Sequence, residues 1–135
     1  MLDFENSSIR LWIDRSIRLM YAEWLRPVTS EEYREANSML LDLLNEHNVQ
    51  HCIVDSSKLG DITPDDERWT MEHFIPAIIA SKLQKMARVS GEDKASMAKF
   101  EQFASKAEPI YLGNIQVRQF ITYKEALDWI GNVPV

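Results

Sequence analysis

The chain has little cysteine, glycine or proline, and it lacks a long apolar run. A single cysteine, Cys52, excludes an intramolecular disulfide and fits a reducing compartment. Only four glycines are present and no glycine-rich loop precedes a helix, which argues against a phosphate-cradling nucleotide site. The longest apolar run, 74–80, is interrupted by Pro76 and is too short to span a bilayer. Because the start of the chain is also neither basic nor apolar, we expect a cytoplasmic protein without stable membrane insertion.

Acidic residues outnumber basic ones by 21 to 15, which gives a formal net charge of −6. A nucleic-acid backbone binds to a basic face, so this charge argues against nucleic acid as a partner. It also gives no support for docking on an anionic membrane surface. The 135 residues fit one domain, 1–135, with a core large enough to fold without disulfide or metal staples.

Alternation of polar and apolar residues predicts antiparallel strands near the start of the chain. Ile9, Leu11 and Ile13 form one apolar set with a period of two. A second set runs from Ile17 to Trp24, with a turn at 14–16 between the two. Strands with this pattern bury one face and pair as a meander. Their outer edge has to be covered or blunted, so a homodimer is a reasonable expectation.

Helix starts recur along the rest of the chain and separate further strands. Each start combines a capping hydroxyl or acid with further acids or a proline in the first turn. The expected elements are a helix from Thr29 to about 46–48, a strand 51–55, a helix from Thr63 that bends or breaks at Pro76, a strand 85–90, a helix capped by 90–93, a strand 116–121 and a helix 122–131. The order β-β-β-α-β-α-β-α-β-α predicts an α/β fold with a mixed sheet, antiparallel at the start and mainly parallel later.

The most informative segment runs from His51 to Gly60. An apolar run at 52–54 stops at an acid, which two hydroxyls, a lysine, a leucine and a glycine follow. This pattern predicts a buried strand whose carboxyl end opens into a polar loop, where open α/β sheets place their functional groups. The candidate interaction loop consists of Asp55, Ser56, Ser57, Lys58, Leu59 and Gly60.

The loop sequence D-S-S-K-L-G resembles the D-S-S-G-L-G motif of the anti-sigma-factor antagonists, the SpoIIAA-like or STAS domains. In that family a serine of the motif is a phosphorylation switch. The resemblance implies a SpoIIAA-like fold, in which helices lie largely on one face of a mixed sheet. Beyond the loop, the chain is similar to uncharacterised bacterial STAS/SEC14-type proteins, through a tryptophan-ended strand at 21–24, Trp69, and Phe120 with the segment 126–129.

Carried over residue by residue, Asp55 matches the acid at the strand end, Ser56 the phosphoacceptor and Ser57 the second hydroxyl. The sequence departs from the motif at Lys58, which replaces a glycine, and the next helix starts later than in the antagonists. The intervening stretch and the helix start are acidic, with Asp61, Asp65, Asp66 and Glu67. These acids would repel a phosphate on Ser56, and Lys58 would offset that repulsion as a local cation.

No recognisable spacing places a histidine or a second acid beside Asp55 or Ser56. We therefore expect no catalysis, and the simplest role of Asp55 and the two serines is to satisfy amides of the loop as turn residues. The acids lack the ordered pattern of a calcium loop, and no zinc spacing is present. Neither a metal nor a cofactor is expected.

Two aromatic residues after the loop, Trp69 and Phe74, are candidates for a cleft or an interface. Trp69 is the more informative, because it lies about one turn into the helix that follows the loop. The sequence thus favours a non-catalytic binding or regulatory module that meets a protein partner through residues 55–61. The alternative is a carrier of a small apolar or lipid-like ligand in a cavity lined by aromatic side chains.

Overall fold

The computed structural model describes residues 3–107 and 115–131. Its elements are β1 (Phe4–Glu5), β2 (Ile9–Asp14), β3 (Leu19–Trp24), α1 (Ser30–Glu46), β4 (His51–Asp55), α2 (Pro64–Trp69), the π-helical turn η1 (Thr70–Phe74), α3 (Ile75–Ile79), β5 (Lys85–Val89), α4 (Lys94–Ala107), β6 (Gln116–Phe120) and α5 (Tyr123–Gly131). The order of strands and helices agrees with the order expected from the sequence. Within these two ranges, no helix is long and apolar enough to cross a membrane.

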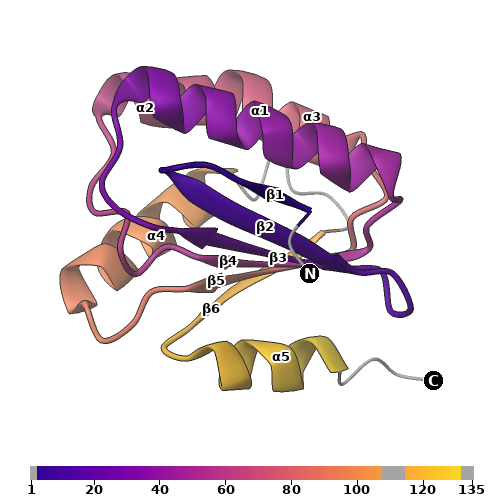
Figure 1. The fold of residues 1–135 in the computed structure, drawn as a ribbon. Helices are drawn as coiled ribbons and strands as arrows, with labels where there is room; N and C mark the ends of the chain where they lie inside the picture. Colours follow the sequence, from indigo (N-terminus) through magenta and orange to yellow (C-terminus); the bar gives the residue numbers. More distant parts are fainter. Residues whose placement is uncertain (1–2, 108–114, 132–135) are drawn as a thin grey trace.

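The six strands form one sheet in the order β1-β2-β3-β4-β5-β6 (Figure 1). The first three strands pair antiparallel, and β3 to β6 pair parallel. The expectation of a mixed sheet with an antiparallel start is therefore confirmed. Each parallel pair is joined by a helical crossover, as parallel neighbours require.

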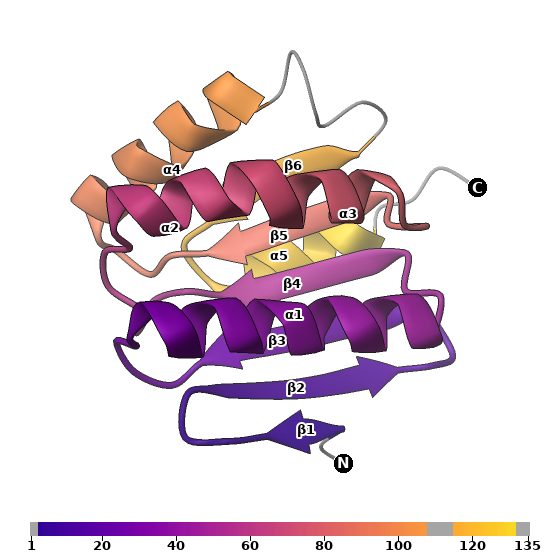
Figure 2. The same cartoon turned by 90° about the horizontal axis from the view of Figure 1, so that it is seen from above.

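Helices lie largely on one face of the sheet, as expected. Figure 2, seen from above, shows α1 and the continuous stretch α2–η1–α3 lying side by side over the sheet and running roughly along its strands. Their apolar faces pack on alternate residues of the sheet, among them Leu11, Met20 and Cys52, and form the main core. The opposite face has a smaller core in which α5 packs Ala126 and Ile130 against the central strands.

Helix α4 belongs to the same side as α1. Met86 of β5 packs against the main core, so Arg88, two residues further along the strand, faces the same side. The guanidinium of Arg88 lies 5.0 Å from the centre of the Phe100 ring in α4. The side chain of Gln119 in β6 donates to the carbonyl of Met97 at 2.8 Å. These contacts hold α4 over the β5–β6 end of the sheet.

The helix starts behave as their sequences predict. Thr29 and Glu32 form a complete capping box at α1. The Thr63 hydroxyl accepts the third amide of α2, whose first residue is a proline. Asp93 accepts the Ser96 amide at 3.1 Å, and the Thr122 hydroxyl accepts the Glu125 amide at 3.2 Å. Caps of this kind fix where each loop ends and each helix begins.

One local expectation was wrong. Ile17 is not part of the second strand: it is 51% exposed in the hairpin turn, and β3 begins only after Arg18, which has a φ of 52°. Of the bend or break expected at Pro76, the break is absent, because α2, η1 and α3 follow one another without a gap. A π-helical turn precedes the proline, and Ile75 donates its amide to the carbonyl of Thr70, five residues back. A wider turn of this kind absorbs the missing amide and the bulk of the proline ring.

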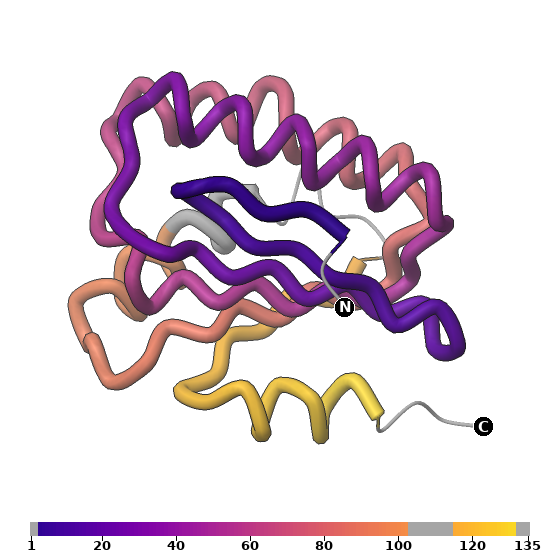
Figure 3. The backbone as a smooth tube through the Cα atoms, viewed as in Figure 1, coloured from indigo at the N-terminus to yellow at the C-terminus, as the bar shows by residue number. Residues whose placement is uncertain are grey.

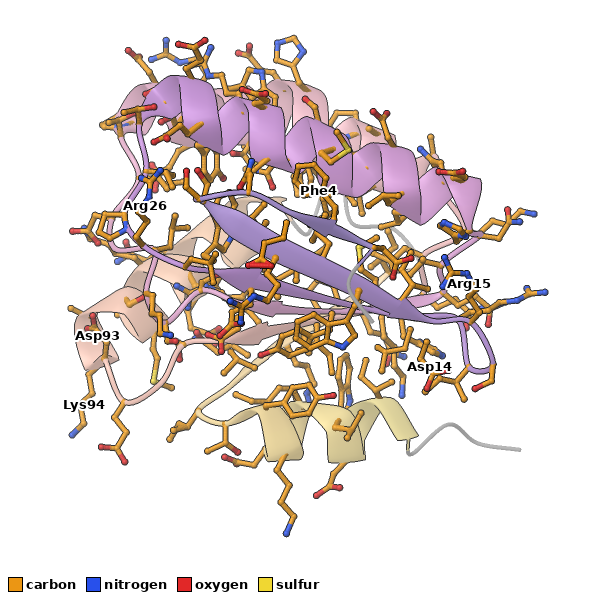
Figure 4. The ribbon with its side chains drawn as sticks, in the orientation of Figure 1. Phe4, Asp14, Arg15, Arg26, Asp93 and Lys94 are labelled. Carbon is orange, nitrogen blue, oxygen red and sulfur yellow. The ribbon has the colours of Figure 1, made fainter. Side chains whose placement is uncertain are left out.

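All four parallel strands end at the same edge of the sheet, here called the carboxyl edge. Figure 3 follows the chain there from β3 into α1 and from β4 into α2. Arg26, which follows β3, and Asp93, which precedes α4, lie at this edge, whereas Asp14 and Arg15 lie at the hairpin on the opposite side (Figure 4). The candidate loop, residues 55–61, therefore sits among the starts of several helices.

Candidate functional site

The candidate loop leaves the sheet through a fixed turn. Asp55 is the last residue of β4 and lies between Glu23 of β3 and Val89 of β5 in the register of the sheet. The Ser56 amide donates to the Val89 carbonyl at 2.8 Å, which extends the parallel ladder by one bond. The Ser56 carbonyl then accepts the Leu59 amide at 3.1 Å, which closes a turn. The backbone of the loop is thus bonded on both sides of Ser56.

The side chain of Asp55 also holds the loop in place. One carboxylate oxygen accepts both the amide and the hydroxyl of Ser57, at 3.0 and 2.7 Å. The other oxygen accepts the Tyr21 hydroxyl at 3.4 Å. Burial and then the charge of Asp55 raise the pKa of Tyr21, so its hydroxyl stays protonated and remains a donor. Asp55 thus acts as a turn residue that satisfies a loop amide, whereas the Ser57 hydroxyl donates to Asp55.

Exposure divides the six loop residues into two groups. Ser56 is only 8% exposed, and Leu59 is also buried, with its side chain in the main core. Ser57 and Lys58, between them, are exposed at the tip. Gly60 has a φ of 76°, a backbone conformation that a residue with a Cβ adopts only with strain. The loop therefore exposes a short polar tip, Ser57 and Lys58, between the buried residues Ser56 and Leu59.

Lys58 and the next loop of the edge border this tip. The Lys58 ammonium lies 4.0 Å from the carboxylate of Glu23, which the Arg10 guanidinium also approaches at 3.5 Å. A Cβ added to Gly91, after β5, would lie 3.5 Å from the Cβ of Ser57. The loops after β4 and β5 therefore touch, and the tip has little room to move toward β5.

The acidic stretch after the loop splits into separate roles. Asp66 is 3% exposed, accepts the Ser30 hydroxyl at 2.8 Å and pairs with the Arg34 Nε at 3.1 Å. It thereby ties the start of α2 to the first turns of α1. Asp61 is exposed and pairs with Lys99 of α4 at 2.9 Å. Asp66, the most buried of these acids, therefore has a structural role, and its charge is paired with Arg34 rather than free to repel a phosphate on Ser56.

A cavity of about 160 Å³ lies between the starts of α1 and α2. Its apolar wall consists of Leu59 of the candidate loop, Ile62 just after the loop, Val28 and Tyr33. Its polar lining comes from the capping residues and first turns of the two helices, chiefly Ser30, Thr63 and Asp66. The candidate loop and this cavity are therefore parts of one site.

The two candidate aromatics lie outside the cavity lining. Trp69 is half-buried and packs edge-on to Tyr33, with ring centres 6.1 Å apart, while the Arg34 guanidinium lies 5.8 Å from its ring. Phe74 is buried in the main core. Trp69 contacts Tyr33, which lines the cavity, and its role at an interface stays a prediction.

The three histidines lie away from the loop. His51 begins β4, at the end of the strand opposite Asp55; His47 follows the last residue of α1; and His73 is exposed in η1. Glu23 lies opposite Asp55, but the cations of Arg10 and Lys58 flank its carboxylate. In the part of the chain that the structure describes, no three His, Cys, Asp or Glu residues gather as a metal site would require.

Sequence reasoning missed several residues that shape the site, namely Tyr21, Glu23, Ser30 and Arg34. The alternation in β3 places Tyr21 and Glu23 on one face, but only the register with β4 brings them to Asp55. Ser30 directly follows a correctly predicted cap, and its partner Asp66 lies 36 residues further along the chain. A motif search along the sequence cannot find pairs that distant.

The mixed six-stranded sheet, with α1 to α4 on one face and α5 on the other, defines a SpoIIAA-like α/β domain. A solved structure with this fold is that of an uncharacterised protein of the DUF3478 family from Shewanella loihica PV-4. It matches 96% of this chain and 99% of its own length, with a TM-score of 0.58 and 16% sequence identity. No family model matches the chain, and neither does any curated protein. The fold implied by the loop resemblance is confirmed, and at this identity the likeness shows the fold alone.

Proposed function

We propose that the chain is a non-catalytic protein-binding module of regulatory type, whose partner docks on the loop of residues 55–61. The supporting observation is the form of the loop. An exposed tip, Ser57 and Lys58, is held on a turn that is bonded to two strands and anchored by buried Leu59. A loop with a fixed shape loses little conformational entropy when a partner binds, so it suits recognition.

The proposal includes a switch: phosphorylation of Ser56 controls whether the partner can dock. A phosphate adds a charge of about −1.5 to −2 and three acceptor oxygens. At 8% exposure Ser56 has no room for such a group while the turn is closed, since its amide and carbonyl are bonded to Val89 and Leu59. Modification therefore requires the loop to open, and the phosphate then holds it open by its charge and size.

Phosphosite mapping tests the gate. The full chain is incubated with ATP and a bacterial lysate, and modified residues are identified by mass spectrometry in the wild type, Ser56→Ala and Ser57→Ala. The proposal expects phosphate on Ser56 that survives Ser57→Ala and disappears in Ser56→Ala. It also expects faster amide exchange at Leu59 in the modified protein, because its bond to Ser56 is lost. Modification of exposed Ser57 alone would remove Ser56 as the switch.

Carriage of a small apolar ligand is a second candidate function, and the cavity beside Leu59 is the observation that supports it. Its volume of about 160 Å³ is close to that of a cavity of about 150 Å³ that binds benzene. It therefore suits a ligand of that size and not a lipid chain. Native mass spectrometry of protein purified without detergent should then show a bound mass of roughly benzene size, which Ile62→Phe removes.

A homodimer stays a prediction. The outer edge of the N-terminal strands, which motivated it, is partly closed by the chain itself. The short strand β1 covers part of β2, the Asp3 carboxylate accepts the Ile13 amide at 2.7 Å, and Arg15 pairs with Asp3 at 2.7 Å. A charged side chain bonded to an edge amide opposes strand addition there. Sedimentation equilibrium giving a monomer mass would reject the dimer.

A further inference from the structure

We infer that the cavity between α1 and α2 is an anchor pocket for one apolar side chain of a basic segment of the partner protein. This inference rests on the proposed function and names the partner chemistry of the same site. The pocket lies beside the exposed tip of the loop, because Leu59 is at once the buried anchor of the loop and part of the pocket wall. A partner that contacts the tip is therefore within reach of the pocket.

The lining favours an apolar occupant. The polar side chains of the lining already have partners within the chain, including Asp61, which pairs with Lys99, and Thr29, which caps α1. The Thr63 hydroxyl accepts the Asp66 amide at 3.1 Å, and the Asp66 carboxylate is held by Ser30 and Arg34. A polar ligand would bind weakly here, because the polar groups already have hydrogen-bond partners within the protein. An apolar ligand would gain binding free energy by removing the apolar wall from water.

The size of the pocket limits the occupant to a single side chain. At about 160 Å³ it compares with a cavity that accepts benzene, so a leucine, methionine or phenylalanine side chain fits and a larger ligand does not. Interfaces commonly gain most of their affinity from one or two such side chains seated in a desolvated pocket. The pocket is thus the place where a partner would gain most by docking on this edge.

Charge around the pocket selects a basic segment. Four ion pairs nearby are closed within the chain, those of Arg26 with Glu32, Arg34 with Asp66, Arg68 with Asp65, and Lys99 with Asp61. The exposed acids Glu31 and Glu67, next to Ser30 and Asp66 in the two helices, form no ion pair within the described ranges. Figure 2 shows the starts of these helices at the same end of the molecule. Two unpaired negative charges beside an apolar pocket complement lysine or arginine residues that flank an apolar side chain.

The pocket and the proposed gate share Leu59. When the loop opens at Ser56, the bond from the Leu59 amide to the Ser56 carbonyl is lost and the pocket loses part of its wall. Phosphorylation would then weaken anchor binding without placing the phosphate in the pocket. Phosphorylation at Ser56 would therefore lower the affinity for the partner through the position of Leu59.

Selection from random 12-residue peptides displayed on phage, against the immobilised full chain, tests the inference. The expected consensus is one large apolar residue with lysine or arginine within a few positions. Affinity of the selected peptide should fall about tenfold or more in Ile62→Phe, which fills the pocket, and in Val28→Met, which fills it from the α1 side. The matched control is Ile17→Phe, at an exposed position of the hairpin on the opposite edge.

Charge reversal completes the test. Glu31→Lys and Glu67→Lys should each weaken binding several-fold at low salt, and Glu46→Lys at the far end of α1 should not. Failure to enrich any peptide, enrichment of acidic peptides, or peptide binding that neither pocket-filling variant weakens would overturn the inference. In the last case, loss of partner capture by Lys58→Trp, which covers the tip with a bulky neutral side chain, would leave the proposed docking loop standing, which separates the two failures.

Discussion

Ser57 donates both its hydroxyl and its backbone amide to one carboxylate oxygen of Asp55, at 2.7 and 3.0 Å. The other oxygen of Asp55 accepts the hydroxyl of Tyr21, whose ring stacks on Trp12 with centres 4.0 Å apart. One side chain at the end of a central strand thus links the exposed tip of the loop to the aromatic packing beneath the sheet. The shape of the tip depends on this acid.

Replacement of Asp55 by alanine should loosen the tip. The variant loses the bonds from Ser57 and leaves the Tyr21 hydroxyl without its acceptor, so the free energy of unfolding should fall by about 1–2 kcal/mol. Amide exchange at Ser57 should become faster. Asp61→Ala, a change to an exposed ion-paired acid at the far end of the same loop, should alter stability by no more than about 0.5 kcal/mol. Unchanged exchange at Ser57 in Asp55→Ala would show that the carboxylate does not hold the tip.

The sequence was sufficient to predict features that depend on local periodicity and local hydrogen bonds. Alternating residues indicated the strands, and the capping residues Thr29 and Thr63 indicated where helices start, because both signals act over a few residues. Ile17 continued the alternation but lies in a turn, since the pattern cannot show where the backbone leaves the sheet. The π-helical turn before Pro76 was also missed, because it depends on how the helix packs on the sheet.

The site was only partly predictable for the same reason. The loop motif indicated the strand end and the polar tip. The partners of that tip, Tyr21 and Glu23, come from another strand and are placed by sheet register. The pocket forms where the Ser30–Asp66 bond brings two helix starts together. No single segment of the sequence encodes it.

Cys52 should be unreactive in the folded protein. Its complete burial raises the pKa of the thiol to about 12, and the thiolate is the reactive form. A disulfide reagent at pH 8 should label the native protein only as fast as it unfolds, and the denatured protein at once. In a Ser57→Cys variant, the new exposed thiol at the loop tip should react immediately under native conditions. Rapid labelling of native wild-type protein would contradict the burial of Cys52.

Glu32 should titrate at unusually low pH. The hydrogen bond from Arg26 and the amide of Thr29 hold the pKa of Glu32 down to about 2, below its ordinary value of 4.5. Because the folded-state pKa is depressed, the stabilising contribution is present above pH 4.5 and is lost as the pH falls toward 2. Carbon-detected NMR titration should show this pKa, and Arg26→Gln should raise it toward 4.5. Arg15→Gln, at the opposite edge, should leave the pKa of Glu32 at about 2.

His51 should make stability depend on pH in mildly acidic solution. Burial, and then the charge of Lys85, lower the pKa of His51 below its ordinary value of 6.5. The unfolded chain therefore binds a proton more readily, so this contribution to stability is lost as the pH falls below 6.5. Denaturant unfolding at several pH values should show that the free energy of unfolding declines less below pH 6.5 in His51→Gln than in the wild type. Lys85→Met should raise the pKa of His51 part of the way, and an unchanged value would refute the role of Lys85.

We propose that the tip of the 55–61 loop, Ser57 and Lys58, is the docking surface. Quantitative affinity capture by the full chain tests this, compared between two matched substitutions that replace a lysine by a bulky neutral side chain, Lys58→Trp at the loop tip and Lys82→Trp at the exposed opposite edge. Proteins captured by the wild type should be retained by Lys82→Trp and lost by Lys58→Trp, because the bulky side chain covers the tip of the loop. Equal retention by both variants, with both folded, would contradict it.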